Sequence, residues 1–230
     1  MTKYKTYIIH YSKLNDRKIN LDKLLQSKNI QHEYILEFDK ENLTNEIISK
    51  YYEDNRSKFN SKVKLWDQKA NKYYKMSLAE ISCSIKHIEA IKKIAYGEDE
   101  FGLILEDDVI VNNDNYLKII DNLVTSKKSW DAIFIGEGMG KKFISEKIGI
   151  KRFLPFKLFK IKHPATNCLE AYILKKDSAK EIYENLLPIN LVIDWELAYQ
   201  FYELKMNIYW SKSTLFYQGS KKEIYESTLR

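Results

Sequence analysis

Residues 101–111, with the sequence FGLILEDDVIV, constrain the fold of this chain more than any other segment. An apolar run of this kind is typical of a strand that is buried on both faces of a sheet. Burying three adjacent carboxylates inside such a strand is costly without a compensating charge, so we expect Glu106, Asp107 and Asp108 where the strand leaves the sheet. The alternatives for these acids are an ordinary solvated turn or the start of a helix.

The position of the acids also predicts a chemical role. In open α/β sheets, ligands bind at the carboxyl ends of the strands. Clustered carboxylates at such an end suit a hard divalent cation that carries phosphate oxygens. The sequence therefore predicts a metal and phosphate site at the end of this strand.

Length and composition limit the class of protein. A chain of 230 residues with 44% hydrophobic and 30% charged residues can bury a substantial core and is neither disordered nor membrane-embedded. No apolar run approaches the roughly 18 to 20 residues that span a bilayer. Residues 4–9 read as a first strand rather than as part of a signal peptide. We expect one α/β domain over residues 1–230.

The cysteines and the distribution of charge bear on the cellular setting. Cys83 and Cys168 do not form a metal-ligand pair by their spacing, so we expect free thiols in a reducing, cytoplasmic setting.

The net charge of +6 is concentrated in residues 141–163, which hold eight Lys or Arg, one acid and interleaved phenylalanines. This basic segment suits phosphates, an acidic acceptor, nucleic acid or peripheral contact with the inner face of an anionic membrane; the alternative is a solvated loop.

The first part of the chain reads as the opening of a nucleotide-binding βαβ unit. A strand at 4–9 is followed by a polar turn, a helix from about Arg17 and a second strand at 34–38. The first turn lacks Gly-x-Gly-x-x-Gly, which disfavours a Rossmann-type dinucleotide site, and the chain has no Gly-x-x-x-x-Gly-Lys-Ser/Thr loop. Any phosphate must therefore be bound by a metal and by side chains.

Residues 40–75 are polar and aromatic and have no clear period. We interpret them as a polar insertion of irregular helix and loop, placed as a flap over an acceptor. Its aromatic rings fit either sugar stacking or an ordinary core.

A helix is predicted from Ser77 to Gly97. Ser77 and Glu80 have the spacing of a capping box, and Gly97 is typical of a helix end. Apolar residues at helical spacing predict packing on the sheet, while Glu80, Cys83 and His87 form a second face. His87 is either a hydrogen-bonded, partly buried histidine or a catalytic or metal-binding residue.

The order of these motifs resembles glycosyltransferase family 25, which includes lipooligosaccharide and procollagen galactosyltransferases. The resemblance rests first on Ser77-Leu78-x-Glu80-Ile81-x-Cys83-x-x-x-His87 followed by Leu103-Ile104-Leu105-Glu106-Asp107-Asp108-Val109. Further similar segments are Arg17, Trp130-Asp131-Ala132-Ile133-Phe134-Ile135-Gly136, Thr166 with Ala171-Tyr172, Pro188 with Asp194, and Gln218. The chain departs from the family where Ser82 and Lys86 stand in place of Gly and Ser, and the segments 40–75 and 141–163 match nothing in it.

This resemblance implies a GT-A-like α/β fold with a mixed central sheet flanked by helices. It implies transfer of a hexose, galactose or glucose, from a UDP-sugar donor to a hydroxyl of a glycan, lipooligosaccharide or glycoprotein acceptor, with inversion. In this reading Glu106 and Asp108 hold Mn²⁺ or Mg²⁺, because the ligands are all oxygens. Glu106, Asp107, Arg17 and His87 are assigned to donor binding, with Asp107 orienting the strand end. A surface position at the start of the first helix is the alternative for Arg17.

Asp194 is the candidate general base, because inverting transfer needs a group that takes the acceptor proton. It is expected at the end of a short strand, 191–193, just ahead of a helix, and the N-cap of that helix is its alternative role.

Two other functions remain open from the sequence. One is a nucleic-acid or membrane-surface binding module that uses the basic segment; nucleic acid is the less expected partner. The other is a catalytically silent protein of the same fold that serves as a partner subunit.

Overall fold

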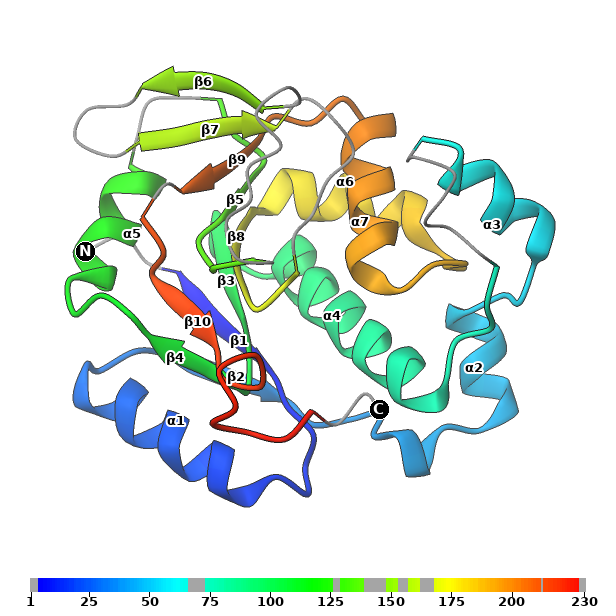
Figure 1. Cartoon of the computed structure of the whole chain (residues 1–230), viewed down its shortest axis with the longest axis horizontal. Helices are drawn as coiled ribbons and strands as arrows, with labels where there is room; N and C mark the ends of the chain where they lie inside the picture. The colour runs from blue at the N-terminus through cyan, green and yellow to red at the C-terminus, as the bar shows by residue number, and fades with distance from the viewer. Residues whose placement is uncertain are drawn as a thin grey trace.

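The computed structural model describes residues 4–65, 73–125, 129–138, 148–152, 157–161, 168–211 and 213–227, with the backbone alone for 148–152 and 157. In these parts of the chain the strands form one large mixed sheet and one two-stranded ribbon, with helices on both sides of the large sheet (Figure 1). The strands are β1 (Lys5–Ile9), β2 (His32–Ile35), β3 (Phe101–Glu106), β4 (Val109–Val111), β5 (Ala132–Phe134), β6 (Ile148–Arg152), β7 (Lys157–Ile161), β8 (Ala171–Lys175), β9 (Ile208–Ser211) and β10 (Phe216–Gln218). The helices are α1 (Asn15–Ser27), α2 (Asn45–Tyr51), α3 (Arg56–Val63), α4 (Leu78–Tyr96), α5 (Tyr116–Val124), α6 (Lys176–Leu186), α7 (Ile193–Glu203) and the 3₁₀ turn η1 (Lys40–Asn42).

The strand order of the large sheet is β2-β1-β3-β8-β5-β9-β7-β6, and β10 pairs with β4 beside it. β1 is parallel to both β2 and β3, whereas β8 is antiparallel to β3 and to β5. The start of β8 therefore lies at the same edge as the end of β3. The expected α/β fold, with a mixed central sheet flanked by helices, is confirmed.

Alternate residues of the strands face two separate cores. On one face, Ile104 of β3 and Tyr172 of β8 pack with α4, α6 and α7. On the other face, Leu103 and Leu105 pack with α1 and α5. Because both faces are covered, β3 is a nearly continuous apolar run until Glu106.

Helix α4 forms where its capping box predicts. The Ser77 hydroxyl accepts the N–H of Glu80, and the Glu80 carboxylate accepts the N–H of Ser77 at 2.8 Å. The helix packs closely on β3 because Gly102 has no side chain: a Cβ there would lie 2.5 Å from Ile94. This contact sets the distance between the C-terminal part of α4 and the start of β3.

Two expected strands differ from the structure. β2 covers His32–Ile35 rather than 34–38, because its parallel partner β1 ends at Ile9 opposite Ile35 and Phe38 has a positive φ of 68°. The strand expected at 191–193 is absent from the described residues. The Glu196 carboxylate accepts the N–H groups of residues 190 and 191, and this turn leads directly into α7.

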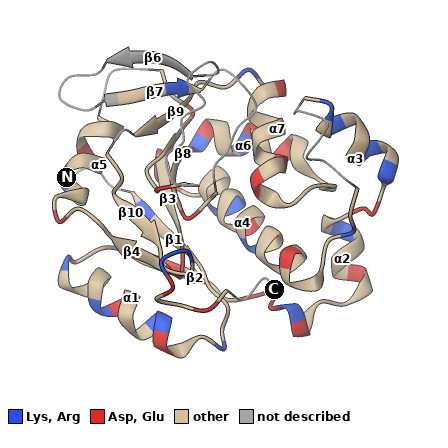
Figure 2. Ribbon diagram, in the orientation of Figure 1, with Lys and Arg blue, Asp and Glu red and all other residues tan. Residues whose placement is uncertain are grey.

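The polar insertion holds short helices, α2 and α3, besides irregular segments. Two of its aromatic residues, Tyr51 and Tyr52, are buried in the core under α4. For these two, the interpretation as ordinary core residues is correct, rather than sugar stacking. Residues 66–72 lie outside the described part of the chain, as does most of the basic segment 141–163. Figure 2 shows basic and acidic residues side by side on α1 and α2.

Among the helices that the structure describes, none combines the length and the apolar character needed to cross a bilayer.

Candidate functional site

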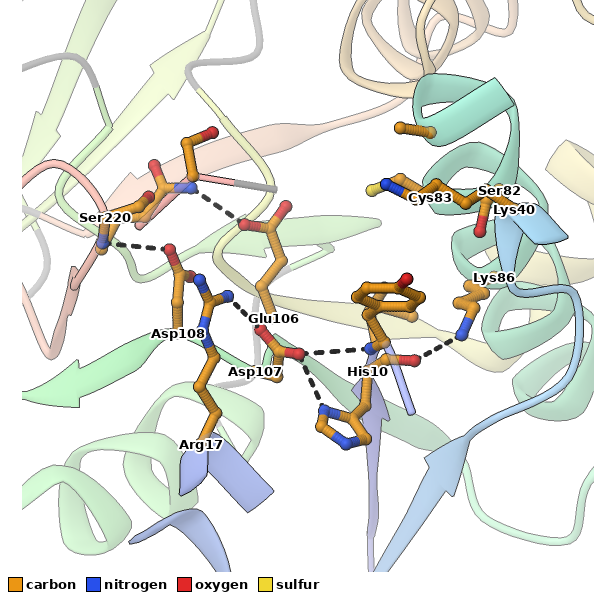
Figure 3. Close-up of a pocket in the computed structure, with 15 residues that line it drawn as sticks. His10, Arg17, Lys40, Ser82, Cys83, Lys86, Glu106, Asp107, Asp108 and Ser220 are labelled. Carbon is orange, nitrogen blue, oxygen red and sulfur yellow. Dashed lines mark hydrogen bonds and ion pairs between the residues drawn. The ribbon is translucent and has the colours of Figure 1, made fainter. Parts of the chain in front are cut away.

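A pocket lies at the carboxyl ends of β1 and β3, facing α4 (Figure 3). The last residue of β3, Glu106, and the turn after it supply the acids, and the loop after β1 supplies His10 and Tyr11. Helix α4 contributes Ser82, Cys83 and Lys86, and Gln218 and Ser220 come from the C-terminal segment. The site is thus assembled at the sheet edge where parallel α/β units bind ligands.

Asp107 is the anchored member of the acidic triplet. Its carboxylate accepts from Arg17 Nη1 at 2.7 Å and from the Tyr11 N–H, and it contacts His10 Nδ1 at 2.8 Å. Burial alone raises the pKa of Asp107, but the hydrogen bonds from His10 and Arg17 bring it below its ordinary value. The carboxylate is therefore a charged anchor that joins β3 to the loop after β1 and to α1.

Arg17 is buried, so the alternative of a surface residue is wrong. Besides pairing with Asp107, its guanidinium donates to the backbone oxygen of Glu226 and lies 5.1 Å from the ring centroid of Tyr225. Arg17 thereby ties the C-terminal segment to the acidic triplet, and it lines the pocket.

Glu106 and Asp108 differ from Asp107, because no charged Lys or Arg among the described residues lies within salt-bridge distance of either. His87 lies beside Glu106, but its imidazole is neutral. Glu106 accepts from Gln218 Nε2 at 3.1 Å, and Asp108 accepts from the N–H of Ser220 at 3.2 Å. Burial, together with the neighbouring carboxylates, raises the pKa of both groups above their ordinary values. Asp108 is 4% exposed, so the alternative of a solvated turn is wrong.

The donor set at this point fits a hard divalent cation. Among the described residues, Oδ1 of Asp108 and Oε1 of Gln218 are buried oxygens without a hydrogen-bond partner. Gln218 also donates from Nε2 to Glu106, and the side chains of Glu106, Asp108 and Gln218 all line the pocket. Oxygen donors of this kind are the ligands of Mg²⁺ and Mn²⁺.

His87 and Cys83 lie on the face of α4 turned toward Glu106. His87 is fully buried, its Nδ1 is 3.2 Å from the Tyr172 hydroxyl, and its Nε2 is 3.6 Å from Glu106 Oε1. Burial lowers the pKa of His87 to about 3, so the imidazole is neutral. The expected hydrogen-bonded histidine is found, more deeply buried than expected, and it does not line the pocket.

Asp194 lies in the first turn of α7, after the N-cap residue Val192, so neither the strand end nor the N-cap role is correct. Its Oδ1 accepts from the N–H of Trp195 at 3.0 Å. Its charge raises the pKa of Glu106 and of Cys83, and the residue does not line the pocket. Burial raises the pKa of Asp194.

Two charged residues of this region were missed by sequence reasoning. Glu170, 1% exposed, directly precedes β8 and accepts the Gly138 N–H at 2.6 Å, and burial raises its pKa to about 7. Lys86 is buried; it donates to the backbone oxygen of His10 and to Asp39 at 2.5 Å. The signal for Glu170 was an acid at the start of an apolar strand; Lys86 carried none, because it looks like an exposed helix residue.

Comparison with known proteins identifies the family. A sequence model of glycosyltransferase family 25, described as an LPS biosynthesis protein, matches residues 3–197. No curated protein matches the chain.

Similar solved structures are distant in sequence. One is a glycosyltransferase involved in glycosylation of the major capsid of PBCV-1, at 13% identity and a TM-score of 0.40, covering 85% of this chain and 67% of that one. Another is a mutant Drosophila β1,4-galactosyltransferase 7 in complex with manganese, UDP-Gal and xylobiose, at 9% identity and 0.43, covering 98% and 76%. A third is S. aureus TarS 1–349, at 12% identity and 0.46, covering 98% and 63%. Because the family model matches most of the sequence, the chain belongs to glycosyltransferase family 25 and is a glycosyltransferase.

Proposed function

We propose that this enzyme is a metal-dependent, inverting glycosyltransferase that moves a hexose from a UDP-sugar to a hydroxyl of a glycan or lipooligosaccharide. The observation that carries the proposal is the pair of pocket carboxylates formed by half-buried Glu106 and buried Asp108. Both have raised pKa values, and Asp108 has an oxygen without a partner among the described residues. Such a pair is stabilised when a cation binds between its members.

In this proposal Glu106, Asp108 and Gln218 hold Mn²⁺ or Mg²⁺. The ion would neutralise negative charge on the diphosphate leaving group as the glycosidic bond breaks. Asp107 acts as a positioning residue, because Arg17, His10 and the Tyr11 N–H already occupy its carboxylate. Arg17 has five N–H groups, and those left over from Asp107 and Glu226 are available to a donor phosphate in the pocket.

Asp194 is the proposed general base. Its charge acts on Glu106, and burial raises its own pKa toward the range in which a carboxylate accepts a proton more readily. The base would remove the proton of the acceptor hydroxyl as that oxygen attacks the anomeric carbon. His87 is proposed to act through Glu106, whose Oε1 its Nε2 faces, rather than by touching the donor.

The acceptor class follows from the family description, LPS biosynthesis, and the donor class from the resemblance of the motifs. Galactose is the first candidate sugar and glucose the second. We infer further that residues 1–230 act as one transferase domain, with 40–75 and the basic segment 141–163 next to an acidic acceptor or an anionic membrane.

A nucleotide panel tests the donor assignment. The melting temperature of the protein is measured with UDP, GDP, CMP and ADP, each with and without Mn²⁺. The proposal predicts selective stabilisation by UDP that requires Mn²⁺, by about 2.7 kcal/mol at one hundred times the dissociation constant. Equal stabilisation by all four nucleotides, or by UDP without metal, would contradict it.

A further inference from the structure

A second group of metal-ligating atoms lies beside the proposed donor site. In the described part of the chain, the ligand atoms of Cys83, His87 and Glu106 all lie within 4.8 Å of one another. Cys83 and His87 are four residues apart on α4 and so share one face of the helix. Glu106 faces them from the end of β3.

The spacing of these atoms is close to that of a coordination sphere. His87 Nε2 and Glu106 Oε1 are 3.6 Å apart, too far for a hydrogen bond. Bond lengths of about 2.0 to 2.3 Å in a tetrahedral zinc site place neighbouring ligand atoms about 3.5 Å apart. The His87–Glu106 pair already has this separation, and the sulfur needs to approach by no more than about an ångström.

The second ring nitrogen of His87, Nε2, is available to a metal. It is buried and has no hydrogen-bond partner among the described residues. The other nitrogen, Nδ1, lies 3.2 Å from the Tyr172 hydroxyl; in the tautomer that carries its proton on Nδ1 and donates it to this hydroxyl, the Nε2 lone pair faces Glu106 and is free for a metal. A lone pair facing a carboxylate is unfavourable unless a cation or a proton lies between them.

We propose that Cys83, His87 and Glu106 form a site for a soft divalent cation of the Zn²⁺ class, distinct from the oxygen-lined site of Glu106, Asp108 and Gln218. Sulfur and imidazole nitrogen are ligands that favour Zn²⁺ over Mg²⁺ or Mn²⁺. On binding, the Cys83 thiol loses its proton to solvent, and sulfur, nitrogen and one carboxylate oxygen bond the ion. A fourth position is open toward the pocket, which Cys83 lines.

The two sites share Glu106. Occupation by Zn²⁺ therefore turns Glu106 away from Gln218 and from the donor metal, and Zn²⁺ inhibits Mn²⁺-dependent UDP binding. This inhibitory consequence rests on the proposed function, whereas the metal site itself does not.

Cobalt(II) tests the site directly, because a Co²⁺–thiolate bond has a near-ultraviolet charge-transfer absorption. The reduced full-length protein is titrated with Co²⁺ and then with Zn²⁺. We expect one equivalent of thiolate-bound Co²⁺ that Zn²⁺ displaces, loss of the band in Cys83→Ser, and its retention in the matched variant Cys168→Ser. Absence of the band in the unaltered protein, or its loss in Cys168→Ser alone, would overturn the proposal.

A second measurement needs no variant and covers the case in which Cys83→Ser does not fold. The alkylation rates of the two cysteines are followed by mass spectrometry with and without Zn²⁺. We expect Zn²⁺ to slow alkylation of Cys83 at least tenfold while Cys168 changes less than twofold. Equal protection of both thiols, or of neither, would overturn the site.

Asp108→Asn separates this proposal from the proposed function. The variant should lose Mn²⁺-dependent UDP binding and keep the Co²⁺–thiolate band. In the unaltered protein, Zn²⁺ should inhibit UDP binding, and Cys83→Ser should need at least tenfold more Zn²⁺ for the same inhibition. If UDP binding shows no Mn²⁺ dependence, the cobalt and alkylation results still decide the zinc site.

Discussion

Arg17 donates from Nη1 to Oδ1 of Asp107 at 2.7 Å, and both side chains are more than nine-tenths buried. The pair joins the first helix to the end of β3 and leaves Glu106 and Asp108 as the two acids of the triplet without a full cationic partner among the described residues. The difference between an anchored acid and two unneutralised neighbours is what makes the cluster suitable for a metal.

Arg17→Ala should destabilise the fold. It leaves the Asp107 charge buried beside two other carboxylates, and removing one partner of a buried pair costs about 3 to 5 kcal/mol. Denaturant unfolding measures the change, with Lys13→Ala at the exposed Lys13–Glu41 pair as the control that should leave the midpoint unchanged. Adding Asp107→Asn to Arg17→Ala should recover part of the loss; an undiminished midpoint in Arg17→Ala would contradict the anchoring role.

Asp194→Asn should separate chemistry from donor binding. The amide keeps the size of the side chain but cannot take the acceptor proton, so turnover should fall about 100-fold or more while donor affinity stays within a few fold. Steady-state kinetics and UDP titration measure the two effects. Asp177→Asn, an exposed acid in the first turn of α6, is the matched control. Full turnover in Asp194→Asn would leave Asp194 with a structural role.

Gln218→Leu should weaken metal binding. It removes the Oε1 atom that lacks a partner and the hydrogen bond from Nε2 to Glu106. The Mn²⁺ concentration needed for half-maximal UDP binding should rise about 10- to 100-fold. Gln200→Leu removes a buried glutamine on α7 and should not change this Mn²⁺ concentration. An unchanged Mn²⁺ requirement in Gln218→Leu would exclude Gln218 as a ligand.

The stability of the metal-free protein should fall as pH rises, partly through Glu170. Its pKa is raised from 4.5 to about 7 in the fold, chiefly by burial, so the folded state holds a proton that the unfolded chain releases. This stabilisation is fully present below pH 4.5 and is lost as pH rises through 7.

Glu170→Gln removes this titration and keeps an oxygen for the Gly138 N–H. Both proteins are compared by the fall in their free energy of unfolding between pH 4.5 and pH 8. This fall should be smaller in the variant than in the unaltered protein, by about 2 to 3 kcal/mol. Denaturant titrations across this range measure the difference. Parallel pH profiles for the two proteins would show that Glu170 does not titrate in this window.

Local signals predicted the elements around the site. The capping box placed α4, and the apolar run ending in three acids placed the end of β3 at Glu106. β2 was misplaced because the length of a strand depends on its partner, and β1 ends at Ile9. The turn before α7 escaped prediction because it depends on Glu196, whose carboxylate folds back on the backbone before the helix.

The acidic site was predicted in position but not in internal arrangement. The local sequence does not distinguish the three acids, and the resemblance assigned Asp107 to orienting the strand end and the other two to the metal. The fold adds the partners: Asp107 pairs with Arg17, whereas Asp108 lacks such a partner among the described residues. Glu170 and Lys86 reach the site region through antiparallel pairing of β8 with β3 and through packing of α4. Such long-range contacts leave no local pattern in a single sequence.

Calorimetric titration of UDP in the presence of Mn²⁺ tests the central claim most directly, with the unaltered protein, Asp108→Asn and the exposed matched control Asp114→Asn. The account predicts Mn²⁺-dependent binding to the unaltered protein and to Asp114→Asn, and a loss of at least 100-fold in Asp108→Asn with the melting temperature of the free protein retained or raised. Equal UDP affinity in all three proteins, or binding that is independent of Mn²⁺, would contradict a metal-dependent donor site at Glu106 and Asp108.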